Sequence, residues 1–284
     1  MNTLPADFVG ADYLELHPDV RAAGVDPARH YLEYGMREGR RYRPEPRELL
    51  PKLDGHYDSD GLRTWHNHDF MADPAFVAAY ERGLAASGVD YGFHWRVHIA
   101  LWAARSAERV PGDFVECGVN RGFMSSAIMH ALDWNATGRT YWLFDTFAGL
   151  DTRQVSDVER SGGVLERNSR ELESGFYTTD IDTVRRNFAE WPRARIVVGA
   201  APGTLAQLAA ERIAFLHLDM NCAEPEVAAI DQLWERLSPG AVVLLDDYAY
   251  RGYQPQKDGL DAWAARTGVP IASLPTGQGL VVKA

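Results

Sequence analysis

Short apolar runs alternate with amphipathic stretches from about Val110 to the end of the 284-residue chain. An apolar run of about four to eight residues bounded by turn residues predicts a buried strand, and an amphipathic stretch between two such runs predicts a crossover helix. This alternation is typical of an α/β domain with a mostly parallel sheet. We therefore expect a doubly wound, seven-stranded sheet with strands in DFVECG (113–118), TYWLFD (140–145), ARIVVG (194–199), IAFLHLD (213–219), AVVLLDD (241–247), PIASL (270–274) and GLVVK (279–283).

Upstream of this sheet the pattern changes twice. Two amphipathic stretches, 73–88 and 94–112, predict helices that pack over the sheet or its ligand edge. The first part of the chain predicts a short helical module that ends in a basic, proline-containing linker, so a boundary is expected near residues 44–52. The predicted division is an N-terminal helical module at 1–48, a helical cap or linker at 49–110, and the sheet domain at 111–284.

Two segments within the sheet domain have predictions of their own. Apolar residues recur at helical spacing after Pro225, which predicts a helix that continues to the SPG sequence at 238–240. The segment 151–180 is polar, rich in Gly and Ser, and weakly periodic, so we expect a mobile loop or lid near a site.

Composition limits the class of partner. The chain has 29 Lys and Arg against 40 Asp and Glu, a net charge of −11, so nucleic acid is not an expected ligand. The two cysteines, Cys117 and Cys222, lie in or beside apolar segments, which predicts buried thiols and a reducing cytoplasm. There is no apolar run long enough for a membrane span and no export signal. The oligomeric state is left open, a homo-oligomer included.

The sequence FVECGVNRG (114–122) joins a predicted strand to a glycine-bracketed turn, where ligands of α/β sheets bind. It lacks the middle glycine of the G-x-G-x-x-G dinucleotide fingerprint, because Asn120 lies between Gly118 and Gly122. The acid before the turn, Glu116, suits a cationic amino-acid cofactor such as S-adenosylmethionine. Asp145 follows the next strand and could grip a ribose, with Phe147 against an adenine; the alternative for Asp145 is a helix or turn cap.

Three carboxylates follow two neighbouring strands: Asp219 ends one, and Asp246 and Asp247 end the next. With no basic partner evident nearby they would repel one another, and a hard divalent cation would relieve that repulsion. The pattern favours magnesium, or manganese or calcium, over zinc. The alternative is a solvated turn in which the aspartates act as caps.

Together these residues resemble the macrocin-type sugar O-methyltransferases, the class I S-adenosylmethionine-dependent family of TylF, MycF and NovP. The resemblance covers roughly Pro111 to Lys283 and rests on GDFVECGVNRG, FDTFAGL, VVGAAPGTL, FLHLDMN and LSPGAVVLLDDY. It implies a Rossmann-like fold, a magnesium triad at Asp219, Asp246 and Asp247, and Asp219 as general base. The implied cofactor-binding residues are Glu116, Gly118, Asn120, Gly122, Asp145, Phe147 and Gly199.

The resemblance implies transfer of a methyl group to a hydroxyl of a sugar or glycosylated acceptor. Family members often carry a second acid and a tyrosine after the first metal aspartate, whereas this chain continues Met220-Asn221-Cys222. The N-terminal module resembles a helical unit found beside glycosyltransferases of bacterial surface-polysaccharide pathways, which favours a glycan acceptor. The alternatives are a catechol or phenolic acceptor, a nicotinamide-dependent oxidoreductase and a non-catalytic binding protein. Three polar residues, His217, Arg96 and His98, are interpreted as structural.

Overall fold

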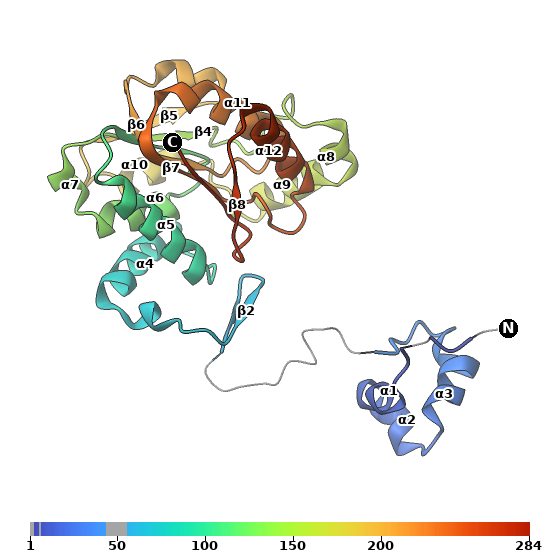
Figure 1. Cartoon of the computed structure of the whole chain (residues 1–284). Helices are drawn as coiled ribbons and strands as arrows, with labels where there is room; N and C mark the ends of the chain where they lie inside the picture. Colours follow the sequence, from blue (N-terminus) through green and yellow to red (C-terminus); the bar gives the residue numbers. More distant parts are fainter. Residues whose placement is uncertain (1–2, 6, 44–55) are drawn as a thin grey trace. The chain divides into compact units, whose positions relative to one another are not determined.

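The computed structural model describes residues 3–5, 7–43 and 56–284. The chain forms two compact units, Met1–His56 and Tyr57–Ala284 (Figure 1). The boundary expected near residues 44–52 lies outside the described residues. The described part of the expected cap begins at His56, and from Tyr57 on it belongs to the same compact unit as the sheet. The division at 49–110 stays a prediction.

The N-terminal unit is a small helical module, as predicted. It contains α1 (Gly10–Leu16), α2 (Pro18–Ala22), α3 (Pro27–His30) and a π-helix, η1 (Tyr31–Gly35). Its core consists of the buried side chains of Tyr13, Val20 and Tyr31. The Tyr13 hydroxyl lies 3.0 Å from Nδ1 of His30, which gives this buried phenol a polar partner.

The second unit contains the predicted seven-stranded sheet, in the order β5-β4-β3-β6-β7-β9-β8. Its five parallel strands occupy one side and the centre, and β9 pairs antiparallel with both β7 and β8. All seven predicted strands are confirmed: β3 (Asp113–Cys117), β4 (Tyr141–Asp145), β5 (Ala194–Val198), β6 (Ile213–Leu218), β7 (Leu237–Leu245), β8 (Ala272–Ser273) and β9 (Gly279–Val282).

Helices cover both faces of the sheet because its strands are apolar on both sides. On one face Phe114, Phe215 and Leu244 pack in a core with α4 (Pro74–Ser87), α5 (His94–Ala107) and α6 (Phe123–Ala131). On the other, Val115, Leu216 and Val243 pack with α11 (Ala223–Leu233) and α12 (Gln254–Thr267). Both cysteines, predicted to be buried, are buried and free. The remaining elements are the hairpin β1 (Tyr57–Ser59) and β2 (Leu62–Thr64), α7 (Trp134–Thr137), α10 (Ile181–Asn187), and the short 3-10 helices η3 (Asp69–Ala72), η4 (Gly203–Gln207) and η5 (Trp234–Arg236).

The segment 151–180, predicted as a loop, contains two helices, α8 (Asp157–Ser161) and α9 (Val164–Glu173). The first begins with a capping box, in which the Ser156 hydroxyl accepts a hydrogen bond from the Glu159 backbone N–H and the Glu159 carboxylate accepts from that of Ser156. This Ser-x-x-Glu spacing is a helix-start signal that the compositional reading passed over. The segment is therefore an ordered helical layer rather than an irregular loop.

The helix predicted to run to SPG is shorter than expected. It ends at Leu233, and SPG lies within β7. Gly240 has a φ of +85°, and the pairing of β6 with β7 shifts register just beyond Ile213. The irregular start of β7 accommodates the proline and glycine, which a regular central strand would exclude.

The strand order creates a switch point between β3 and β6. From β3 the chain proceeds outward through β4 and β5, then returns to β6 on the other side of β3 and continues to β7. The crossovers therefore diverge, and the carboxyl ends of β3 and β6 border the crevice where ligands of such sheets bind. None of the helices in the described ranges has the length and apolarity that a membrane crossing needs.

Candidate active site

A cavity of about 450 Å³ opens over the carboxyl ends of β3, β4, β6 and β7. Most of the residues predicted as functional line it, although they come from strands far apart in the sequence. Gly122 and Phe147 are the two exceptions. The predicted residues in its wall are Glu116, Gly118, Asn120, Asp145, Gly199, Asp219, Asp246 and Asp247.

Gly118 is required by the protein backbone itself. Its φ is +94°, and a Cβ atom at this position would lie 1.7 Å from the carbonyl oxygen of Asp219. The sequence predicted a glycine here to admit a ligand; the structure shows that the ends of β3 and β6 already leave no room for a side chain. Gly122 also has a packing role, because a Cβ there would lie 2.4 Å from the Phe188 ring.

Asp145 holds the glycine turn. Its Oδ2 accepts hydrogen bonds from the backbone N–H groups of Val119 and Asn120, at 2.7 and 2.8 Å. Its Oδ1 accepts from the N–H of Phe147 at 2.7 Å. This is the turn-capping role that the sequence left open as the alternative. A grip on a ribose remains a prediction, and the ring of Phe147 is buried in the core, away from the cavity.

Asn120 ties the turn to the segment after α9. Its side-chain amide donates to the carbonyl of Phe176 and accepts from the N–H of Thr178, both at 2.9 Å. Gly199, at the end of β5, donates its N–H to the carbonyl of Asp145 at 2.9 Å. Both residues lie in the cavity wall, where they shape the side of the crevice above β3 and β4.

Glu116 and His217 form a buried pair across β3 and β6, where they are register partners. Oε1 of Glu116 lies 3.0 Å from Nδ1 of His217. Burial disfavours a charged imidazole, but the carboxylates of Asp246, 3.5 Å from Nε2, and of Glu116 raise the pKa of His217 well above its usual value. Oε2 of Glu116 is buried with no hydrogen-bond partner among the described residues. This oxygen leaves an acceptor available to a cationic ligand in the cavity.

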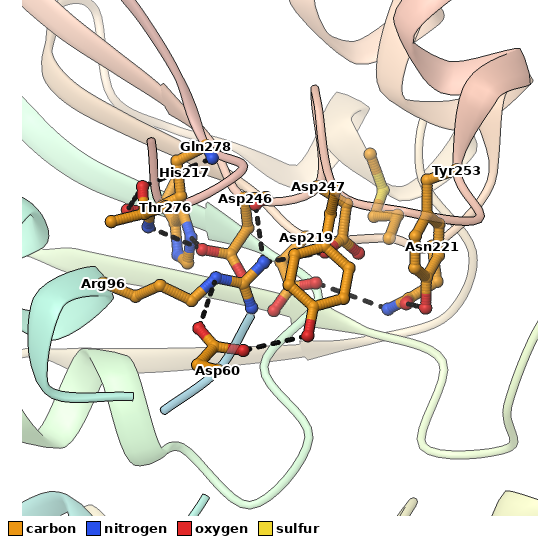
Figure 2. A network of polar contacts seen from close by, with 12 residues as sticks. Asp60, Arg96, His217, Asp219, Asn221, Asp246, Asp247, Tyr253, Thr276 and Gln278 are labelled. Carbon is orange, nitrogen blue, oxygen red and sulfur yellow. Dashed lines mark hydrogen bonds and ion pairs between the residues drawn. The ribbon is translucent and has the colours of Figure 1, made fainter. Parts of the chain in front are cut away.

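Arg96 of α5, which the sequence led us to interpret as structural, lies at the centre of the site (Figure 2). Its guanidinium lies 2.9 Å from Oδ1 of Asp247 and 3.1 Å from Oδ2 of Asp246, and it donates to the Asp246 carbonyl at 2.8 Å. The premise that the acids lack a basic partner is therefore wrong. A usable signal existed: Arg96 is spaced at helical intervals from Ala100, Ala103 and Ala104, which face the core.

Two further residues hold Arg96 in place. Asp60, in the turn between β1 and β2, lies 3.6 Å from the Arg96 Nε and accepts a hydrogen bond from the Tyr250 hydroxyl at 2.9 Å. The Tyr250 ring also lies under the guanidinium, 4.7 Å from ring centroid to Cζ. His98, by contrast, stacks on Phe70 outside the cavity and has no part in this network.

The three aspartates have different electrostatic environments. Burial, together with Asp246 and Asp247, raises the pKa of Asp219 well above its usual value. Burial also raises the pKa of Asp247 to about 6 although Arg96 opposes the rise. For Asp246 burial is outweighed by Arg96, His217 and Gln278, which hold the pKa of this carboxyl below its usual range. In the absence of another cation, Asp246 is therefore the acid that is most firmly ionised.

The carboxylates fit a hard divalent cation in their chemistry. Ligand atoms of His217, Asp219 and Asp246 lie within 4.8 Å of one another, whereas Asp247 is not in that group. Asp246 has both oxygens engaged, since Gln278 donates to its Oδ1 at 2.8 Å and Arg96 contacts Oδ2. Among the described residues, Asp219 and Asp247 each keep one oxygen without a hydrogen-bond partner. An ion here would use these oxygens and share Asp246 with Arg96.

Asn221 occupies the position where the sequence departs from the family pattern. Its amide nitrogen lies 3.3 Å from Oδ1 of Asp219, and its oxygen accepts from the Tyr253 hydroxyl at 2.8 Å (Figure 2). Asn221 therefore links the aspartate at the end of β6 to the loop before α12. This tyrosine, Tyr253, follows β7, whereas Asn221 follows β6.

Comparison with known proteins gives consistent results. The family model of macrocin-O-methyltransferase (TylF) matches residues 99–265, more than half of the chain. A Streptomyces olivaceus protein named 8-demethyl-8-(2,3-dimethoxy-alpha-L-rhamnosyl)-tetracenomycin-C 4'-O-methyltransferase is 32% identical over 177 residues, 59% of this chain and 64% of its own. Mycinamicin III 3''-O-methyltransferase of Micromonospora griseorubida is 29% identical over 146 residues, 49% of this chain and 56% of its own. The chain thus spans less than two thirds of these relatives' lengths.

Among solved structures, the O-methyltransferase NovP superposes with a TM-score of 0.59 at 23% identity, covering 76% of this chain and 97% of NovP. The calicheamicin methyltransferase CalS11 superposes with a TM-score of 0.50 at 17% identity, covering 82% of this chain and 99% of CalS11. At these identities the similarity demonstrates a shared class I methyltransferase fold. Because the family model spans β3 through most of α12 and includes every strand that borders the cavity, the chain belongs to the macrocin-O-methyltransferase (TylF) family.

Proposed function

We propose that the protein is a metal-dependent O-methyltransferase that moves a methyl group from S-adenosylmethionine to a hydroxyl of a sugar or glycosylated acceptor in the cytoplasm. The observation that carries the proposal is the arrangement of acids at the switch point. Among the described residues, Glu116 has a buried oxygen without a hydrogen-bond partner on the β3 side, and Asp219 and Asp247 each have one such oxygen on the β6 and β7 side. The family match and the names of the relatives support the same reaction.

The residues at the end of β3 suit the methyl donor. The ammonium and sulfonium groups of S-adenosylmethionine both favour nearby carboxylates, and Glu116 is the acid with an oxygen to offer. The turn from Gly118 to Gly122 keeps its shape through the hydrogen bonds of Asp145, so the donor would meet a preformed wall. The methyl donor is already activated, and orientation of the two reactants is therefore the main contribution required of the protein.

The residues at the ends of β6 and β7 suit the acceptor. When bound, a hard divalent cation would supply Lewis acidity that lowers the pKa of an acceptor hydroxyl. Asp219 and Asp247 would hold that ion through their free oxygens, and the other oxygen of Asp219, Oδ1, would take the hydroxyl proton. Arg96 keeps Asp246 and Asp247 in fixed orientations by direct contact with both. Arg96 and the ion would together neutralise the negative charge of the three aspartates.

Two measurements test the proposal. Calorimetry should detect binding of S-adenosylhomocysteine, and Glu116→Gln should weaken it by about tenfold, the loss of one charge-assisted hydrogen bond. Glu224→Gln, an exposed acid in the first turn of α11, is the matched control and should leave it unchanged. Transfer of labelled methyl groups to a panel of sugars and catechols then identifies the acceptor class. If the protein does not bind S-adenosylhomocysteine, the proposed methyltransferase function is wrong. If it methylates only catechols, the proposed sugar acceptor is wrong.

A further inference from the structure

Arg167 of α9 is an arginine in the cavity wall that forms no ion pair with a residue in the described part of the chain. Three arginines line the cavity: Arg96, Arg121 and Arg167. Arg96 contacts Asp246 and Asp247, and Arg121 donates to the Gly175 carbonyl at 3.0 Å. The Arg167 guanidinium, by contrast, makes no hydrogen bond or ion pair with any residue in the described ranges. Its side chain therefore offers all of its N–H donors to the cavity or to solvent.

The guanidinium is nevertheless held in one orientation. Its Cζ lies 4.4 Å from the centroid of the Tyr253 ring, in the loop that follows Asp246 and Asp247. Contact with an aromatic face restrains the guanidinium group while its N–H donors remain available in the plane of the fork. Such a fork matches the oxygens of a carboxylate or a phosphate, which it can bind through two parallel hydrogen bonds.

Arg167 lies on the acceptor side of the cavity rather than on the side of the glycine turn. Tyr253, against which it stacks, is linked through Asn221 to Asp219. Tyr177 and Asp247 line the same cavity as Arg167. The contact with Tyr253 and the shared cavity wall place the cation on the side of the aspartates that the proposed function assigns to the acceptor hydroxyl.

Compensation of the acid cluster does not account for Arg167. The cluster already has Arg96 in direct contact, whereas Arg167 forms no ion pair with a described acid. Glu171 lies one helical turn further along α9 and also lines the cavity, at a spacing where an ion pair could form. No such pair is present. The guanidinium therefore remains available to an anion from outside the chain.

We infer that Arg167 binds an anionic group of the sugar acceptor, a carboxylate or a phosphate, so that acidic sugars or sugar phosphates are preferred over neutral sugars. The inference rests on the proposed O-methyltransferase function. A cavity of about 450 Å³ must hold the methyl donor together with the reacting part of the acceptor. Arg167 lines this cavity, so the anionic group would lie on the part of the acceptor that enters it.

Binding of three simple sugars tests the inference. The full chain is saturated with S-adenosylhomocysteine and titrated with glucuronate, glucose 1-phosphate and glucose. At least one of the anionic sugars should bind about tenfold to a hundredfold more tightly than glucose, the range expected for charge-assisted hydrogen bonds. Comparison of the two anionic probes distinguishes a carboxylate from a phosphate. Equal binding of all three, or no binding of either anion, would overturn the inference.

Variants assign the preference to the residue. Arg167→Gln should abolish the preference for the anionic sugar, and Arg167→Lys should retain part of it because the charge remains. Arg170→Gln, on the same helix but exposed and outside the cavity wall, is the matched control and should bind like the wild type. In methyl transfer the loss in Arg167→Gln should appear mainly in KM, since the reacting groups are untouched.

Binding of S-adenosylhomocysteine distinguishes a failure of the proposed function from a failure of the role of Arg167. If the wild type does not bind S-adenosylhomocysteine, the proposed function itself fails. If wild type and Arg167→Gln bind it equally but neither favours anionic sugars, only the role of Arg167 is wrong. A selective loss of product affinity in Arg167→Gln would assign the arginine to the amino-acid carboxylate of the methyl donor, and this too would overturn the inference.

Discussion

Arg96 and Asp247 form a buried ion pair, with 2.9 Å between a terminal guanidinium nitrogen and Oδ1. The two residues are 151 positions apart in the sequence, one on α5 and the other just after β7. The same guanidinium also contacts Asp246 and, at 3.6 Å, Asp60, so one arginine joins three acids. Removal of the arginine would leave the carboxylates of Asp246 and Asp247 buried without a cation.

Replacement of Arg96 by Met should destabilise the fold by about 3 to 5 kcal/mol, because two buried carboxylates would lose their partner. Urea denaturation followed by tryptophan fluorescence gives the free energy of unfolding. Arg105→Gln, an exposed arginine on the same helix, is the control and should change it by less than about 0.5 kcal/mol. A change in Arg96→Met no larger than in the control would show that the pair makes no net contribution.

Gly118→Ala should prevent normal folding, at a cost above about 4 kcal/mol, since the new Cβ would meet the Asp219 carbonyl at 1.7 Å. Gly138→Ala is the control for backbone conformation alone: its φ is +69° and nothing lies within 4 Å of the added atom. That variant should lose only about 1 to 2 kcal/mol. Thermal unfolding of the two variants measures the difference, and similar midpoints would contradict the close approach of β3 and β6.

Removal of divalent cations by a chelator should abolish methyl transfer while S-adenosylhomocysteine still binds, because the proposed ion serves the acceptor hydroxyl. Added magnesium should restore the rate. Asp219→Asn should lower kcat by about a hundredfold or more, as expected for loss of a general base and a metal ligand. Asp247→Asn keeps the proposed base and should recover in part at high magnesium. Full activity in the chelator would eliminate the metal-assisted mechanism.

Glu226 should make the protein less stable as the pH rises. This acid of α11 is fully buried, and burial, with the charge of Asp247, raises its pKa to about 8 from the value of 4.5 assumed for the unfolded chain. Between these values the unfolded state binds fewer protons than the folded state, so the free energy of unfolding falls as pH increases. Below about pH 4.5 both states are protonated and this cost is absent.

Glu226→Gln removes the titration but keeps an oxygen that can accept from the Met220 N–H. The variant should equal the wild type in stability near pH 4.5 and exceed it by roughly 2 kcal/mol or more at pH 8. Denaturant titrations across this range measure the difference. Glu224→Gln, the exposed neighbour, should follow the wild-type profile. If the Glu226→Gln difference is independent of pH, the carboxyl is ionised throughout.

Local sequence patterns were sufficient to predict the class of fold and the edge of the sheet at which the acids lie. Apolar runs with two-residue alternation or continuous burial are local signals, and each of the seven predicted strands is present. Since parallel strands end at one edge of a sheet, the sequence alone assigns Glu116, Asp219, Asp246 and Asp247 to one crevice, and all four line the cavity. Local signals predicted the segment 151–180 less well. Its polar composition indicated a loop, although the segment contains a capping box that begins a helix.

The contacts that these residues make could not be predicted from local patterns. Arg96 pairs with Asp246 and Asp247 because α5 packs across β6 and β7, a contact between layers that leaves no mark in the spacing of the acids. Asp145 holds the glycine turn, and Gly118 makes room for a carbonyl of the neighbouring strand. The physical reason is the same in each case: strand and helix formation follow local periodicity, whereas charge pairing and close approach depend on residues brought together from distant parts of the chain.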